Sequence, residues 1–288
     1  MQTVKSLKQS IRNPKEDKAM ADEIARLHRT IAQFSRSRRK YRLELPDKSN
    51  TIRFGAVSCL HLGSLYERQD SFREYVRFCE KVGIRTILVA GDILDGYGIY
   101  KGQAFEQYAI GMDAQLKVLK NKILSPSSID FHFITGNHDE SFKKLIGVNI
   151  GEAIAAQHDN WHFLGESYGE ITLVNKGGAS AKVIMVHPSG GTAYAISYHL
   201  QKHIEALSGG QKPDLWLEGH YHKAVWLPGY RNVDGFQLGT FQSQTPFMAG
   251  KGLAAMIGGW EIEVTVNPRK HLTRTVKARF HSFYEPQG

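Results

Sequence analysis

The most constraining feature of this 288-residue chain is a regular alternation of short apolar segments with longer amphipathic ones. Three segments have the length and apolar character of buried strands, and three others have helical periodicity. The predicted strands are residues 52–57, 86–90 and 131–135, and the predicted helices are residues 70–81, 103–123 and 140–157. This order predicts right-handed crossovers and a parallel sheet at the centre of the fold.

The second half of the chain is richer in strands than the first. Strands are predicted at residues 171–174, 182–186 and 215–217 and at several places after Ala224, with a helix near residues 193–206. We therefore expect an α/β fold in which a second sheet packs on the first.

The net charge of +9 is concentrated near the N-terminus. Residues 1–45 hold 12 basic and 5 acidic side chains, a balance of +7, so the remaining residues have a balance of only +2. The segment Pro46–Asn50 is typical of a turn-rich linker. We therefore predict a basic arm over residues 1–45 and one globular domain over residues 51–288.

The arm has the pattern of a helix. Asn13, Pro14 and Glu16 form a capping signal, and an apolar stripe follows at spacings of three and four residues. Its basic side chains could contact the phosphates of a nucleic acid. The alternative is a solvated helix whose stripe packs on the globular domain or on a second subunit. The oligomeric state stays open.

Composition excludes several other classes of protein. No apolar stretch reaches the roughly 18 residues of a membrane span, and the N-terminus lacks the apolar core of a signal peptide. We therefore expect a cytoplasmic protein with no membrane partner. Its two cysteines, Cys59 and Cys79, are too few for a disulfide framework.

Side chains that can bind metals follow five of the predicted strands directly. They are His61, Asp92, Asn137, His187 and the pair His220 and His222. Ligands of open α/β sheets bind outside the carboxyl ends of the strands, so we expect these loops to converge. Glycines precede Asp92, Asn137 and His220, where they would let the backbone turn sharply.

This mixture of oxygen and imidazole ligands suits Mn, Fe, Ni or Zn. Six such residues are too many for one four-coordinate ion. They suit two divalent metals about 3.5–4 Å apart that share a carboxylate, an arrangement used for phosphoryl transfer. The sequence therefore predicts a bimetal site.

The ordered motifs resemble those of the calcineurin-like metallophosphoesterases. They are Cys59-Leu60-His61, Gly91-Asp92-Ile93-Leu94-Asp95, Gly136-Asn137-His138-Asp139, His187 and Gly219-His220-Tyr221-His222. The resemblance covers residues 52–222 and implies two mixed sheets flanked by helices, a four-layer α/β/β/α sandwich. The segments 187–194 and 242–247 are similar to stretches in phage and prophage-type members, and the resemblance to DNA-repair nucleases of the superfamily is more distant.

The resemblance also implies a role for each matching residue. His61, Asp92 and His222 would bind the first metal, and Asn137, His187 and His220 would complete the second, with Asp92 bridging both. His138 would contact the phosphate and protonate the leaving oxygen, and Asp139 would orient His138. Asp95 would hydrogen-bond to a metal ligand without binding a metal itself, and the alternative is that Asp95 is only a turn residue. The implied reaction is hydrolysis of a phosphoester by a hydroxide that the two metals activate.

One position departs from the family pattern, because Cys59 stands where the family has an aspartate. A thiolate favours Zn or Fe over Mn or Mg. Three interpretations compete: Cys59 binds the first metal, Cys59 weakens the first site, or the chain has reduced activity. We favour a retained bimetal site with an altered preference at the first metal.

The leading functional hypothesis is a metal-dependent phosphodiesterase that acts on nucleic acid or nucleotides, with phosphomonoesters as a further substrate class. The segments 187–194 and 242–247 would flank its site. The alternative is a degenerate phosphoesterase fold that serves as a binding or scaffold protein. The natural substrate and the identity of the metals stay open.

Overall fold

The computed structural model describes residues 40–45, 49–120, 128–266 and 274–284. Contacts between Cα atoms divide the chain into residues 1–38 and 39–288, and every described residue belongs to the second unit. The predicted helix of the arm lies outside the described residues.

One sheet has six strands in the order β12-β11-β2-β3-β4-β5. The strands β2 to β5 run parallel to one another, whereas β11 pairs antiparallel with both β2 and β12. Their bounds are β2 Thr51–Val57, β3 Thr86–Ala90, β4 Asp130–Thr135, β5 Trp161–Glu166, β11 Gly258–Val266 and β12 Arg274–Ser282. The predicted parallel core is therefore confirmed, with an antiparallel edge added from the C-terminal part of the chain.

The other sheet also has six strands, in the order β1-β6-β7-β8-β10-β9. It is mixed, since β6 pairs antiparallel with β7 while β7, β8 and β10 are parallel. The bounds are β1 Lys40–Leu45, β6 Tyr168–Asn175, β7 Ser180–Val186, β8 Leu215–Glu218, β9 Ala224–Tyr230 and β10 Val233–Leu238.

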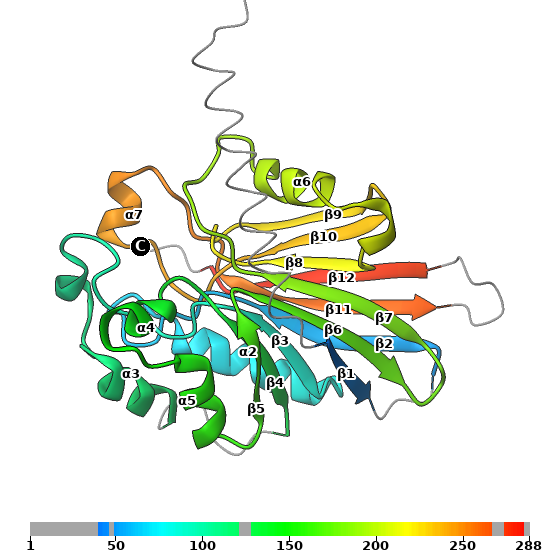
Figure 1. Cartoon of the computed structure of the whole chain (residues 1–288), viewed down its shortest axis with the longest axis horizontal. Coiled ribbons are helices and arrows are strands. Elements are labelled where there is room, and N and C mark those ends of the chain that lie inside the picture. Colours follow the sequence, from blue (N-terminus) through cyan, green and yellow to red (C-terminus); the bar gives the residue numbers. More distant parts are fainter. Residues whose placement is uncertain (1–39, 46–48, 121–127, 267–273, 285–288) are drawn as a thin grey trace, which may run out of the picture. The chain divides into compact units, whose positions relative to one another are not determined.

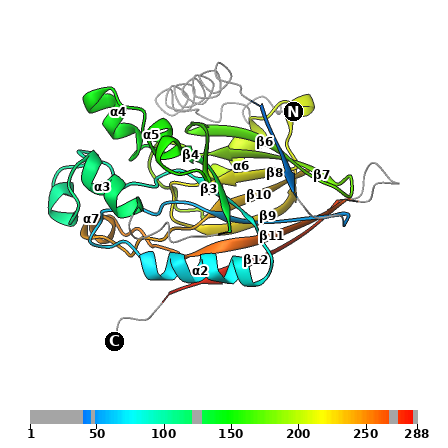
Figure 2. The same cartoon turned by 90° about the horizontal axis from the view of Figure 1, so that it is seen from below.

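Two apolar cores hold these layers together. Side chains from both sheets, such as Phe54 and Leu88 from one and Leu173 and Leu217 from the other, form the core between the sheets. A second core lies between the first sheet and helices, where Phe72 and Tyr75 pack against Ile87 and Phe133. Figures 1 and 2 show the two sheets stacked with helices outside them. The predicted layered α/β architecture is confirmed.

The helices agree with prediction where the apolar pattern is uninterrupted. Helix α2 (Gln69–Lys81) buries Phe72, Tyr75 and Cys79 as expected. The other described α-helices are α3 Met112–Val118, α4 Glu140–Ile146, α5 Ile150–Gln157, α6 Tyr198–Glu205 and α7 Pro246–Gly250, and η1 and η3 are 3₁₀ turns over Gln103–Glu106 and Gly209–Gln211. Helix α6 packs against β10, on the outer face of the second sheet (Figure 1).

Two long helices of the prediction are broken in the structure. Residues 103–120 hold η1 and α3 instead of one helix, because Gly111 with φ 89° lies between them, and residues 121–123 of the predicted helix lie outside the described residues. Residues 140–157 divide at Gly147, a left-handed C-cap of α4, and Asn149 then caps α5 through its side chain. A glycine often ends a helix, and an asparagine two residues later often caps the next one. The predicted single helix did not take this pair into account.

The strand β1 corrects the predicted boundary of the arm. Lys40–Leu45 pairs in parallel with β6, although the sequence analysis assigned these residues to the arm and placed the boundary after them. Tyr41, Leu43 and Leu45 alternate with charged residues and contact the core between the sheets. This period of two is the signal of a half-buried strand.

Candidate metal centre

Loops after five strands meet at one edge of the two sheets, where the predicted ligands come together. Backbone hydrogen bonds join the first two loops, since Cys59 N donates to Gly91 O and His61 N donates to Asp92 O. Gly219 N donates to Val186 O and joins the loops after β7 and β8. The predicted convergence at the carboxyl ends of the strands is therefore present in the structure.

The backbone of these loops is unusual for residues that carry side chains. Cys59, His61, Asp92, His220 and His222 all have φ between 47° and 78°. A left-handed conformation costs a non-glycine residue roughly 1–2 kcal/mol, and such positions concentrate at functional sites. The local strain turns consecutive side chains toward the same centre.

The glycines before the ligands have two different roles. Gly91 has φ 82°, so it makes the sharp turn that the sequence analysis predicted. Gly136 lies outside the left-handed region, and there the requirement is space, because a Cβ atom would lie 2.2 Å from Asp92 Oδ1. At Gly219 a Cβ atom would lie 2.3 Å from the carbonyl oxygen of Ala90. At Gly136 and Gly219 the close approach of neighbouring loops is therefore what requires glycine.

Cys59, His61 and His222 form one half of the site, here called the sulfur half. The Nε2 atoms of His61 and His222 lie 3.1 Å apart, and Cys59 Sγ belongs to the same cluster. All three residues are buried. Sγ of Cys59 accepts hydrogen bonds from Ser58 Oγ at 3.0 Å and from His220 N at 3.3 Å. These donors are the kind of support that a metal-bound thiolate receives.

Asn137, His187 and His220 form the other half, here called the oxygen half. His187 Nε2 lies 3.0 Å from Asp92 Oδ2 and 3.2 Å from Asn137 Oδ1. The ring of His220 lies with its centroid 5.3 Å from that of His187. Asn137 and His220 are partly exposed, so this half lies at the opening of the site. Asp92 lies between the halves, because Oδ2 is also 3.9 Å from His61 Nε2.

Hydrogen bonds fix which imidazole nitrogens carry protons. His187 Nδ1 faces the carbonyl oxygen of Ala90 at 2.7 Å, and His61 Nδ1 faces Asp95 Oδ1 at 3.2 Å. Both partners only accept, so each Nδ1 must donate and each neutral ring presents the lone pair of Nε2 to the centre. His220 Nε2 similarly donates to the carbonyl oxygen of Gly190, at 2.8 Å, which leaves the lone pair of its Nδ1 free for a ligand.

Burial and neighbouring charges set the protonation of the site. Burial, reinforced by the nearby imidazoles, lowers the pKa of His220 to about 4 and that of His222 well below its usual value. Although burial opposes its ionisation, the imidazoles of His187, His138 and His61 hold the pKa of Asp92 well below the usual range. Burial and the Asp92 carboxylate raise the pKa of the Cys59 thiol. Neutral His220 and His222 and an ionised Asp92 are the ligand forms that a metal requires. Against the effect of burial, the Asp92 carboxylate raises the pKa of His187, so a metal would compete with a proton there and at the Cys59 thiol.

This donor set fits two divalent cations. In the oxygen half, the lone pair of His187 Nε2 faces two oxygen acceptors, and a cation would satisfy all three atoms. In the sulfur half, Nε2 of His61 and Nε2 of His222 face each other beside the thiol of Cys59, and a cation would replace that contact. Cys59, His61 and His222 would hold one ion, Asn137, His187 and His220 the other, and Asp92 both.

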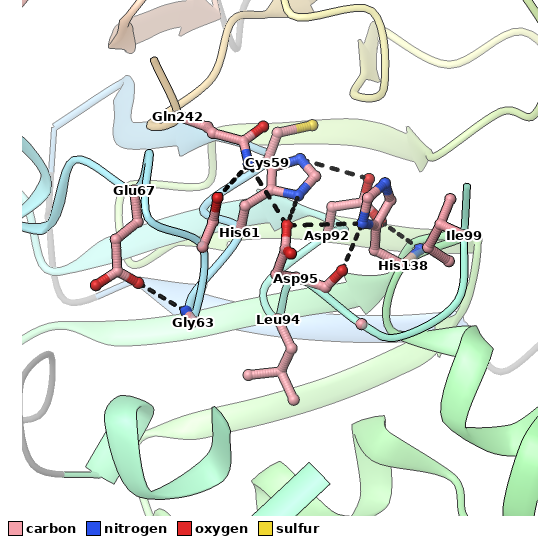
Figure 3. A network of polar contacts seen from close by, with 12 residues as sticks. Cys59, His61, Gly63, Glu67, Asp92, Leu94, Asp95, Ile99, His138 and Gln242 are labelled. Carbon is pink, nitrogen blue, oxygen red and sulfur yellow. Dashed lines mark hydrogen bonds and ion pairs between the residues drawn. The ribbon is translucent and has the colours of Figure 1, made fainter. Parts of the chain in front are cut away.

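A buried network behind the sulfur half was only partly predicted. Asp95 supports His61 as expected, and it also accepts hydrogen bonds from three buried glutamines. Gln107 Nε2 lies 2.6 Å from Asp95 Oδ2, Gln103 Nε2 lies 3.3 Å from the same oxygen, and Gln242 Nε2 lies 3.4 Å from Asp95 Oδ1. Figure 3 shows Asp95 connected to His61, His138 and Gln242. No sequence motif identifies these three glutamines as partners of Asp95.

His138 and Asp139 occupy different environments. His138 packs edge-on against His61 with ring centroids 4.5 Å apart, and its Nδ1 lies 2.6 Å from the carbonyl oxygen of Asp95. The carboxylate of Asp139 instead accepts hydrogen bonds from the backbone N–H groups of Ile93, Leu94 and Gly136. Asp139 therefore joins the loops after β3 and β4, and the predicted orientation of the His138 ring comes from Asp95.

The two segments predicted to flank the site do contact it. The carbonyl oxygen of Gly190 accepts a hydrogen bond from His220, and Gln242 donates a hydrogen bond to Asp95.

A family model described as calcineurin-like phosphoesterase matches residues 52–224. The chain therefore belongs to this family, whose members normally use a pair of divalent metals. Membership supports hydrolysis of phosphoesters as the general class of activity.

Curated relatives are more specific in name but remote in sequence. The chain is 24% identical over 240 residues to the DNA polymerase II small subunit of Thermoplasma acidophilum, covering 72% of this chain and 49% of that protein. It is 27% identical over 279 residues to the protein of that name from Methanothermobacter thermautotrophicus, covering 81% and 57% respectively. The chain thus spans about half the length of these relatives.

Among solved structures, Vacuolar Protein Sorting 29 from Cryptosporidium parvum is similar, with 13% identity and a TM-score of 0.40 over 81% of this chain and 98% of the other. Within the part of the chain that the structure describes, no helix is long and apolar enough to cross a membrane.

Proposed function

We propose that this chain is a metal-dependent phosphodiesterase that acts on nucleic acid. The observation that carries the proposal is the arrangement of two ligand halves around Asp92, with His138 beside them. When bound, a pair of divalent metals would lower the pKa of a water molecule and offset the charge on the phosphoryl oxygens.

The residues of the chain contribute orientation and proton placement. Asp95 holds a proton on Nδ1 of both His61 and His138, through its carboxylate and its carbonyl oxygen respectively. The Nε2 atom of His138 is then the one left to contact a phosphoryl oxygen or a leaving oxygen. Burial lowers the pKa of His138, so a lower pH than usual is needed before that atom carries a proton that it can donate to a leaving oxygen.

Nucleic acid is the substrate class with most support. The curated relatives are named as subunits of a DNA polymerase. Residues 1–38, which precede β1, contain nine basic and four acidic side chains, and we propose that this arm contacts phosphates.

The substrate panel that tests the proposal compares an aryl phosphodiester with an aryl phosphomonoester in Mn, Ni, Zn and Mg, followed by single- and double-stranded DNA and RNA. We expect the diester to be the better small substrate. Absence of turnover on every substrate, with metals bound, would contradict the proposal.

His138→Ala should reduce turnover of the aryl diester by about 100-fold or more while both metals stay bound. Metal content by mass spectrometry provides the control, because a loss of metal in this variant would mean that His138 is a ligand instead.

The arm is tested by deletion of residues 1–38, which leaves β1 in place. We expect weaker binding of DNA, a smaller dependence of binding on salt, and unchanged turnover of the aryl diester. If DNA binding has the same salt dependence with and without the arm, the arm does not contact the phosphates.

A binding protein that has lost its reaction is the second candidate. It is favoured by Cys59, which stands where the family pattern has an aspartate. A chain that retains no metal after purification without chelator would support this candidate over the enzyme.

A further inference from the structure

Aromatic side chains lie exposed on the two loops that meet at Asp95. Phe105 in η1 has 88% of its surface exposed, although burial of an aromatic ring is normally favourable. Phe247 in α7 is 36% exposed and stacks on Tyr100, with ring centroids 4.2 Å apart and an interplanar angle of 18°. Phe105 directly precedes Glu106, which contacts both residues of this stacked pair, and the three rings are called the aromatic platform below.

Hydrogen bonds hold the platform in place. Glu106 joins its two loops, because its carboxylate accepts from the Tyr100 hydroxyl at 2.6 Å and from the backbone N–H of Phe247 at 3.3 Å. The charge of Glu106 is therefore engaged within the protein. The ammonium of Lys251 lies 5.6 Å from the centroid of the Phe247 ring and adds a positive charge at the platform.

Both loops of the platform are fixed to the metal centre. Gln103, in the same 3₁₀ turn as Phe105, donates to the backbone and carboxylate of Asp95, and Gln242, four residues before α7, donates to that carboxylate. Figures 1 and 2 place α7 and the loop that contains η1 on the same side of the domain. A substrate held on the platform would thus have a defined position relative to His61 and His138.

We propose that the aromatic platform binds an unpaired base of a single-stranded nucleic acid whose backbone enters the metal centre, with Phe105 as the principal stacking surface. This inference rests on the proposed function. Planar rings beside a lysine suit the π-face of a base and its neighbouring phosphate, and such stacking is tolerant of sequence. In a duplex the bases are already stacked on one another, so the platform selects single strands or frayed ends.

The test measures binding of a fluorescent 12-nucleotide oligothymidylate with phosphorothioate linkages to the full chain by anisotropy. A second probe of the same length carries abasic sites, so it offers the same charges without bases. Phe105→Ala should weaken binding of the thymidylate probe by about 5- to 100-fold and leave binding of the abasic probe unchanged.

Matched variants separate stacking from other effects. Phe105→Tyr keeps the ring and should bind like the wild type, whereas Phe105→Leu keeps an apolar side chain without a π-face and should bind like Phe105→Ala. Ile146→Ala changes a side chain on α4 that is 58% exposed and should leave both probes unaffected. Equal binding of the two probes by the wild type, or an equal loss for both probes in Phe105→Ala, would overturn the platform.

Failure of the platform and failure of the proposed function are distinguishable. Turnover of the aryl diester by the wild type reports the proposed function, since that substrate carries no base. The ratio of the two oligonucleotide affinities reports the platform alone.

Discussion

The two halves of the metal centre are built from different chemistry on a common scaffold. The sulfur half combines a thiol with two imidazoles and is buried, while the oxygen half combines an amide oxygen with imidazoles and lies partly open. Asp92 belongs to both. The departure from the family pattern therefore lies in the sulfur half, but Cys59 also clusters with Asp92 and His187, so its effect extends to the edge of the oxygen half.

The supports behind the halves also differ. The tautomer of His187 is fixed by a backbone carbonyl, which no side-chain substitution removes. The tautomer of His61 is fixed by Asp95, a side chain held by three glutamines. In the sulfur half, both the ligand His61 and the residue that orients it, Asp95, are side chains. Substitution of either can therefore change the metal affinity of this half.

Asp92→Asn should have the largest effect, because the substitution removes the negative charge that both halves share. We expect loss of both metals and a fall in turnover of at least about 100-fold, since loss of even an outer-shell partner typically costs 10- to 100-fold. Metal analysis and aryl diester kinetics check this. Retention of two metals would contradict the bridging position of Asp92.

A pair of single substitutions then separates the halves. His222→Ala should reduce the metal content from two equivalents to about one by emptying the sulfur half, and His187→Ala should empty the oxygen half. With cobalt as the probe, absorption from sulfur-to-metal charge transfer should survive in His187→Ala and disappear in His222→Ala. The same spectrum for both variants would show that the halves are not separate.

Asp95→Asn tests the support behind the sulfur half. The amide keeps the size of the carboxylate but loses its charge, so affinity for the first metal should fall by about 10- to 100-fold while the second is retained. Calorimetric titration of the two sites measures this. An equal loss of metal affinity at both sites would mean that Asp95 stabilises the domain as a whole rather than the sulfur half.

Cys59→Asp should have the smallest effect on turnover and the most specific effect on metal choice. Aspartate tolerates the left-handed backbone at this position, where φ is 55°, and it supplies a harder ligand. Preference should shift from Zn toward Mn by on the order of 10-fold.

The other buried cysteine supplies the control. Cys79→Ala, in α2 and among the apolar side chains of the first core, should leave the metal preference unchanged. If Cys59→Asp and the wild type have the same metal profile, Cys59 is not a ligand.

The sequence alone was enough to predict the sheet core and the convergence of the ligands. The reason is physical: a short apolar run followed at once by Gly-Asp or Gly-Asn-His leaves a parallel strand little choice of where its end lies. The strand β1 was not predicted, because its charged residues were assigned to the basic arm. Tyr41, Leu43 and Leu45 nevertheless alternate regularly with these charged residues.

Other features depend on contacts between segments far apart in the chain. The glutamines around Asp95 lie 8, 12 and 147 residues from it, and nothing in their local sequence distinguishes them from surface glutamines. The role of Asp139 was predicted by adjacency to His138, but three backbone donors determine where its carboxylate points. Side-chain direction is set by the folded loops rather than by spacing in the sequence.

The most direct test of the central claim is a titration of the metal-free protein with Mn²⁺ while hydrolysis of an aryl phosphodiester is followed. The two halves share Asp92, so turnover should stay low through the first equivalent of metal and rise as the second binds. Full activity at one equivalent, or saturation at a single bound ion, would contradict a bimetal site.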